Sequence, residues 1–256
     1  MIFTASVGFY DRGVVDHYNT YMQMCEHGEI VETKSVRYLK WEVGENLELW
    51  TRVKGGQPDA LYHSYYAGGA RMTVALLEKT PRRDESVSDG AFLCRSGACA
   101  GAGWIAGRVP FVFDTPDFHR YDDLLLPRLA AVQLTAFASS MRGFPDEEEF
   151  DEAFPANEKG YCWNYKHFFP AYIMHARDEN NELQAAVTKV SGFVLDAAIL
   201  TNPVTGLDFC WAKVETIGGE VDVVCAPDKL SGYLVKDGIA TADCYLYGRL
   251  IEDRSN

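Results

Sequence analysis

The residues whose types and spacing best suit ligand binding lie near the C-terminal end of the chain. Tyr245, Tyr247 and Arg249 alternate along a segment with the period of two that is typical of a β-strand, so their side chains are expected on one face. Tyrosine rings interleaved with an arginine form the kind of surface on which unpaired bases stack. In the other interpretation the arginine stacks on tyrosine at the rim of a sheet and pairs with Glu252 or Asp253, and the net charge of −13 favours it. The predicted ligand-binding residues are Tyr245, Tyr247, Arg249 and Trp211.

A glycine-rich segment, residues 97–107, superficially matches the fingerprint of dinucleotide-binding proteins. It contains Gly101 and Gly103, and Asp122 and Asp123 follow about twenty residues later, where that fingerprint has its acidic residue. The fingerprint also requires a helix directly after the glycines, because the helix N-terminus holds the pyrophosphate. The next residues, Val-Pro-Phe-Val-Phe, instead predict another strand, and the third glycine is misplaced. We therefore expect a flexible hairpin here and no bound cofactor.

Acidic residues and a histidine gather after this segment, at Asp114, Asp117, His119, Asp122 and Asp123. Carboxylates and an imidazole on one face of a helix could hold a divalent metal ion. No second histidine lies at ligand spacing, however, and the helix dipole explains acids at the start of a helix. The sequence therefore predicts no metal site. The motifs GxSxG, P-loop, CxxC and HExxH are absent, so no catalytic residue is predicted either.

The composition limits the classes of partner and the compartment. The chain has 256 residues, of which 47% are hydrophobic, as in a packed globular protein. Its net charge of −13 repels a phosphate backbone, which argues against nucleic acid as a partner. No run of about eighteen apolar residues predicts a membrane span, and the N-terminus lacks the pattern of a signal peptide. Seven cysteines, an odd number, then indicate reduced, buried thiols in a cytoplasmic protein.

Two stretches of the chain, residues 69–141 and 192–250, look like copies of one unit. Each has three β-rich runs, a segment that starts with proline and a fourth β-rich run. The aligned landmarks are Gly69 with Gly192, Gly90 with Gly206, Cys94 with Cys210, and Thr115-Pro116-Asp117 with Ala226-Pro227-Asp228. Such self-similarity indicates an internal duplication, although strands punctuated by glycine can also resemble one another by chance. In the first copy, Thr115 to Leu126 is expected to form a short helix.

The predicted fold class is mainly β, with α+β character: two tandem small β-barrel units of the oligonucleotide/oligosaccharide-binding (OB) type. Ahead of them we expect a strand over residues 1–10, a helix that ends at Gly28 and a hairpin between Ile30 and Val53. The apolar helix face, which includes Tyr18, Met22 and Cys25, is expected to pack on a sheet. The predicted domains are an N-terminal domain, residues 1–143, an acidic linker helix, residues 144–160, and a C-terminal β-domain, residues 161–256.

These features favour a non-catalytic module that binds a protein or another ligand. Two other functions stay open. One is binding of single-stranded nucleic acid or oligosaccharide on an OB-like face. The other is an enzyme with its site in a cleft between the two repeats. The closing pattern, GGEVDVVCAP followed by LYGRL, is similar to bacterial sequences, and this resemblance implies no chemistry.

Overall fold

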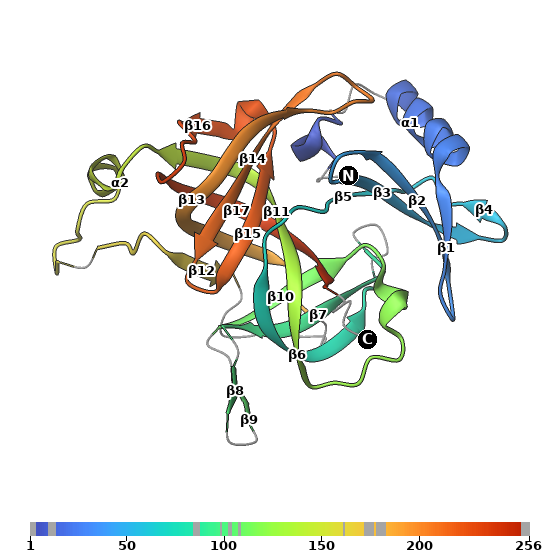
Figure 1. Ribbon diagram of the computed structural model, residues 1–256, viewed down its shortest axis with the longest axis horizontal. Coiled ribbons are helices and arrows are strands. Elements are labelled where there is room, and N and C mark those ends of the chain that lie inside the picture. Colours follow the sequence, from blue (N-terminus) through green and yellow to red (C-terminus); the bar gives the residue numbers. More distant parts are fainter. Residues whose placement is uncertain are drawn as a thin grey trace.

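The protein is mainly β, with two principal sheets and two α-helices in the described part of the chain (Figure 1). The computed structural model describes residues 4–9, 14–83, 88–97, 99–101, 104–106, 109–160, 162–171, 177 and 183–251. The coarse prediction of a mainly β fold is therefore confirmed.

The N-terminal part forms a five-stranded antiparallel sheet, here sheet A, under helix α1 (Figure 1). Its elements are α1 (Val14–His27), β1 (Glu29–Glu32), β2 (Arg37–Gly44), β3 (Leu47–Lys54), β4 (Gln57–Pro58) and β5 (His63–Tyr66). The predicted hairpin is confirmed as β2 and β3, whose turn places Asn46 at a φ of 61°. Asparagine tolerates this left-handed conformation better than other residues with a side chain, apart from aspartate.

The remaining long strands form a ten-stranded sheet, here sheet B. They are β6 (Met72–Pro81), β7 (Gly90–Ser96), β10 (Pro110–Thr115), β11 (Arg128–Phe144), β12 (His167–Pro170), β13 (Val187–Thr201), β14 (Asp208–Thr216), β15 (Gly219–Cys225), β16 (Leu230–Gly232) and β17 (Ile239–Leu250). The order is β12-β13-β14-β15-β11-β17-β10-β7-β6, with further pairings β13–β17 and β11–β6. The long strands β11 and β17 pair antiparallel at the centre. Strands from both predicted domains thus share one sheet, and the domain division itself stays a prediction.

A separate small hairpin consists of β8 (Cys99–Gly101) and β9 (Trp104–Ala106) and projects from the body of the protein (Figure 1). It occupies the segment with the dinucleotide-like glycines, of which Gly103 and Gly107 lie outside the described residues. The expected hairpin is confirmed, and the strand β10 that follows is not the helix a pyrophosphate site requires.

Two predictions of secondary structure were wrong. Residues Ala5–Val7 form a 3-10 helix, η1, instead of part of a strand, because their backbone is held by the 202–205 loop. Asn202 Nδ2 donates to Val7 O at 2.8 Å, and Thr205 Oγ1 donates to Gly8 O at 2.7 Å.

The helix expected from Thr115 to Leu126 is only the 3-10 helix η2 (Phe118–Tyr121). Pro127 disfavours helical geometry at Leu126. The side chains of Asp122 and Asp123 form ion pairs with Lys79 and Lys34. In the second half the corresponding segment is η3 (Pro227–Lys229).

The acidic segment contains helix α2 (Glu147–Ala153), which begins at Asp146, whose side chain accepts the Glu149 N–H. Phe150 is buried against Phe144, while the acids of α2 remain at the surface. The charge run is therefore the solvated side of a short helix.

Helix α1 does not pack as expected. Tyr18 is 61% exposed and Met22 47% exposed, and Cys25 is also exposed, whereas Thr20 and Met24 are buried. The helix thus turns its less apolar side toward sheet A, where Tyr21 OH donates to Pro58 O at 3.0 Å. An apolar stripe is left facing solvent.

The core falls into two main clusters, one enclosed by sheet B and one between the sheets. Cys94, Cys210, Cys225 and Cys244 are buried free thiols, as expected, but Cys25 and Cys162 are exposed. Within the described ranges, none of the helices has the length and apolar character needed to cross a bilayer.

Candidate functional site

Sheet A covers one face of sheet B, and the predicted site residues lie on that covered face. Along β14, Cys210 and Ala212 join the core enclosed by sheet B, while Trp211 between them packs with residues of sheet A. This alternation follows from the pleat of a strand. Along β17, Tyr247 packs in the same layer, and Arg249 lies over Trp50 of sheet A.

A cavity of about 570 Å³ opens in this layer, at the end of sheet A nearest the β2–β3 turn. Its walls include Tyr66, Phe209 and Trp211, and Tyr66 lies 6.1 Å from Phe209 and 6.3 Å from Trp211, measured between ring centroids. Lys213 and Asn46 add polar groups to the lining. Aromatic walls with a few polar groups are the usual make-up of a small-molecule site.

Asp222 lies directly behind this wall and fixes the orientation of Trp211. Trp211 Nε1 donates to Asp222 Oδ1 at 2.9 Å, and Oδ2 accepts Ala70 N and Gln133 Nε2, each at 2.9 Å. Burial raises the pKa of the Asp222 carboxyl above the usual range, although these donors and the charge of Lys213 oppose the rise. Because three donors already use the carboxylate, its role is to position the cavity wall.

Gly68 lets the chain pass over this carboxylate. A Cβ atom on Gly68 would lie 2.3 Å from Asp222 Oδ2, which is far inside contact distance. A Cβ atom on Gly69 would meet only Lys213 Nζ, at 3.4 Å. The close approach at Gly68 is what allows Ala70 N to reach Asp222.

Lys213 supplies a positive charge at the cavity. It pairs across the β14–β15 hairpin with Asp222, so both side chains lie on the covered face. In the part of the chain that the structure describes, no carboxylate forms an ion pair with Lys213 Nζ. The amine therefore keeps its hydrogen-bonding capacity for a ligand.

Arg249 is enclosed and neutralised. Its guanidinium lies 4.6 Å from the Trp50 ring and 4.5 Å from the Tyr65 ring, measured to the centroids. Glu48 Oε2 accepts Arg249 Nη2 at 2.5 Å, and Asp117 Oδ2 lies 3.3 Å from Nε. Burial alone would raise the pKa of Glu48, but Arg249, Trp50 and Lys40 together hold it below its usual value. The arginine thus stacks on aromatic rings and pairs with acids that the sequence did not suggest, while Glu252 and Asp253 lie outside the described residues.

The two predicted tyrosines are enclosed as well. Tyr247 is fully buried, and burial raises its pKa well above the usual value. Tyr245 OH donates to Asp114 Oδ2 at 2.5 Å, and the same carboxylate accepts hydrogen bonds from Arg82 and Ser88. A base from solution cannot reach the buried face of Tyr247. The structure therefore groups Tyr247 and Arg249 with Trp211 in one layer, with only Trp211 at the larger cavity.

The acid cluster considered for a metal is split among separate partners. Asp114 pairs with Arg82, and Asp117 accepts Thr115 Oγ1 at 2.8 Å. His119 and Asp122 lie close, at 3.3 Å between Nδ1 and the carboxylate, but Lys79 also donates a hydrogen bond to Asp122. Among the residues described, no three His, Cys, Asp or Glu side chains are grouped as metal ligands.

Neither family models, nor curated proteins, nor solved structures give a match for this chain.

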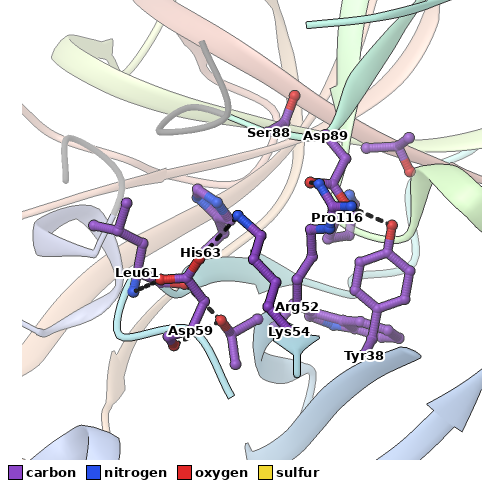
Figure 2. A pocket seen from close by; sticks show the side chains of 12 residues that line it. Tyr38, Arg52, Lys54, Asp59, Leu61, His63, Ser88, Asp89 and Pro116 are labelled. Atoms are coloured by element: carbon purple, nitrogen blue, oxygen red, sulfur yellow. Dashed lines mark hydrogen bonds and ion pairs between the residues drawn. The ribbon is translucent and has the colours of Figure 1, made fainter. Parts of the chain in front are cut away.

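A second, smaller cavity of about 150 Å³ lies beside β3 and β5 (Figure 2). The figure shows Lys54, Asp59 and His63 on one side of it and Arg52, Asp89 and Tyr38 on the other. Leu47 pairs with Tyr66 and Trp50 with His63, so the two cavities lie at opposite ends of the β3–β5 ladder.

Sequence reasoning found Trp211 but missed Lys213 and Asp222. A signal for both was present in the β14–β15 hairpin, whose turn residues are Ile217 and Gly218. Counting outward from that turn places Lys213 opposite Asp222, and an acid within the apolar run of β15 is itself unusual.

Proposed function

We propose that the protein is a non-catalytic binding module whose ligand is a small molecule with a carboxylate and an apolar, preferably aromatic, body. The observation that carries this proposal is the amine of Lys213, which has no ion-pair partner among the described residues, at the aromatic-walled cavity of about 570 Å³. That volume lies in the range of about 300–1,000 Å³ that is common for small-molecule sites.

The polar groups of the cavity fit one negative charge on the ligand. An ammonium group and a carboxylate form a charge-assisted hydrogen bond, which is stronger than a neutral one. Glu45 also lines the cavity, but it is exposed at the β2–β3 turn, where water screens its charge. Tyr66, Phe209 and Trp211 would contact the apolar body of the ligand.

The test measures binding of phenylacetate, indole-3-acetate and octanoate by calorimetry, with phenylacetamide as the uncharged analogue of the first. We expect saturable binding of at least one acid and at least tenfold weaker binding of the amide, since about 1.4 kcal/mol corresponds to tenfold. Lys213→Met should weaken acid binding to a similar extent, and Lys236→Met, at an exposed position, should not. Equal affinity for acid and amide, or no binding of any of these molecules, would contradict the proposal.

A second candidate function, interaction with another protein, is favoured by the exposed stripe on α1. Tyr18, Met22 and Cys25 face solvent, and the exposed acids Glu26 and Glu29 lie next to them. This arrangement suits a partner segment that carries apolar side chains between lysines or arginines.

An amphipathic peptide of leucine and lysine, compared with one of leucine and glutamate, tests this surface. We expect the basic peptide to bind and Met22→Lys to weaken it, while the neighbouring Gln23→Lys has a smaller effect. Binding of both peptides alike, or equal effects of the two substitutions, would rule this surface out.

We also infer that the two halves arose by duplication into OB-like units. Several pairings support this: β6–β11 and β13–β17 are both antiparallel, as are β7–β10 and β14–β15. In addition, β10 runs parallel to β17, and β15 runs parallel to β11. Superposition of residues 72–144 on 187–250 tests the idea, and halves that cannot be superposed over all four strands would refute it.

A further inference from the structure

The smaller cavity contains polar side chains that the strand geometry brings together. Trp50, Arg52 and Lys54 lie two residues apart on β3 and so share one face. His63 on β5 stands opposite Trp50 in the register. Asp59, on the connection between β4 and β5, and Asp89, just before β7, complete the ring of polar groups (Figure 2).

The charges in this cavity are already neutralised in pairs. Arg52 Nη1 donates to Asp89 Oδ1 at 3.3 Å, and Tyr38 OH donates to Asp89 Oδ2 at 2.6 Å. Lys54 Nζ lies 3.2 Å from Asp59 Oδ2. An ion of either sign would have to compete with one of these pairs, so the cavity is better suited to an uncharged ligand.

His63 has unused hydrogen-bonding capacity in this cavity. It lines the cavity and is partly accessible to solvent, and neither of its ring nitrogens forms a hydrogen bond with another residue in the described ranges. Burial lowers the pKa of His63, while Asp89, Asp114 and Asp59 act in the opposite direction. The neutral imidazole then offers one N–H donor and one lone-pair acceptor.

We propose that the His63 cavity is a second binding site, for a small uncharged polyol such as a short sugar alcohol or a monosaccharide. A hydroxyl group both donates and accepts, so neighbouring hydroxyls can satisfy both nitrogens of His63. The spare lone pairs of Asp59 and Asp89 accept further hydroxyls without a change of charge. Nothing in this proposal depends on the carboxylate site at Lys213.

The size of the cavity limits the ligand. At ~30 Å³ for each water molecule, a cavity of about 150 Å³ holds roughly five waters, so binding of a small polyol would replace a cluster of that size. Its hydroxyls would have to reproduce the hydrogen bonds of the displaced waters. A long oligosaccharide would extend beyond the cavity.

The test follows the imidazole proton signals of the intact protein by NMR while erythritol, xylitol or D-xylose is added. We expect a saturable shift of the His63 signal with at least one of these molecules. His63→Phe should weaken binding at least tenfold, whereas His27→Gln, at an exposed position, should leave it unchanged. Lys213→Met should also leave it unchanged, which separates this site from the larger cavity.

Two results would overturn the proposal. One is the absence of any saturable shift at His63 with all three polyols. The other is a shift caused by sodium phosphate and not by polyols, accompanied by a rise in the pKa of His63, which would indicate an anion site. If His63→Phe does not fold, His63→Gln keeps one donor and one acceptor, and the wild-type NMR titration still decides.

Discussion

The indole Nε1 of Trp211 donates to Oδ1 of Asp222 at 2.9 Å, and this bond joins the wall of the larger cavity to the buried polar layer between the sheets. The same carboxylate accepts hydrogen bonds from Ala70 N, on the connection just before β6, and from Gln133 of β11. One side chain thus holds together three segments that are distant in the sequence.

Removal of the Asp222 carboxylate should therefore destabilise the protein and loosen Trp211. Asp222→Ala leaves the N–H donors of Ala70 and Trp211 without this acceptor, each at a cost of about 1–3 kcal/mol, whereas Gln133 Nε2 keeps Tyr66 O and Thr135 Oγ1. We expect a loss of ~2 kcal/mol or more in the free energy of unfolding. Asp222→Asn keeps one oxygen and should cost less. Urea unfolding and the NMR signal of the Trp211 indole N–H measure the two effects. Asp228→Asn, at an exposed position on η3, is the control, with an expected change within ~0.5 kcal/mol.

The glycine pair before β6 provides a test of packing at adjacent positions. Gly68→Ala places a methyl group 2.3 Å from Asp222 Oδ2, so the carboxylate or the backbone must move. We expect a loss of about 1–3 kcal/mol, as for overpacking in a core, and weaker ligand binding at Lys213. Gly69→Ala meets only the flexible end of Lys213 and should be tolerated. Equal melting temperatures of the two variants would show that the clash is not the determinant.

The strands were predictable because their patterning is local. The β2–β3 hairpin follows from alternating side chains and a turn that ends in Asn46, and the β8–β9 hairpin follows from its glycines. The face of α1 was not predictable in the same way. Tyr18 and Met22 are exposed whereas Thr20 and Met24 are buried, because the packing of α1 against sheet A depends on contacts distant in sequence.

The candidate site illustrates the same limit. Tyr245, Tyr247 and Arg249 were expected on one strand, and they are, but no local pattern shows that sheet A covers that strand. The partners of Arg249 are Asp117 and Glu48, which lies 201 residues earlier in the chain. An arginine can therefore be identified as a binding candidate from its neighbours in the sequence. Its neutralisation by distant acids is visible only in the folded structure.

The stacked Arg249 should be essential for stability. Arg249→Met leaves Glu48 buried without its main cationic partner, and we expect a loss of about 3–5 kcal/mol, as for other broken buried pairs. The double variant Arg249→Met/Glu48→Gln should recover part of that loss, because the unpaired charge is gone. Arg128→Met, at an exposed position, is the control for loss of an arginine. A double variant no more stable than Arg249→Met would show that stacking on Trp50 and Tyr65 dominates over the ion pair.

Glu48 also gives the stability of the protein a specific dependence on pH. The pKa of Glu48 is lower in the folded protein than the usual value of 4.5, so the unfolded chain binds a proton more tightly than the folded one. The stabilisation from this group is present above the unfolded pKa and is lost as the pH falls through the folded pKa. Unfolding free energies measured from about pH 7 to about pH 3 should therefore fall more steeply for the wild type than for Glu48→Gln. Parallel curves for the wild type and Glu48→Gln would mean that Glu48 is not held ionised by Arg249.

Asp222 acts in the opposite direction, because its raised pKa costs stability as the pH increases from 3.8 toward the folded value. In the same measurement, Asp222→Asn should accordingly steepen the loss of unfolding free energy on acidification.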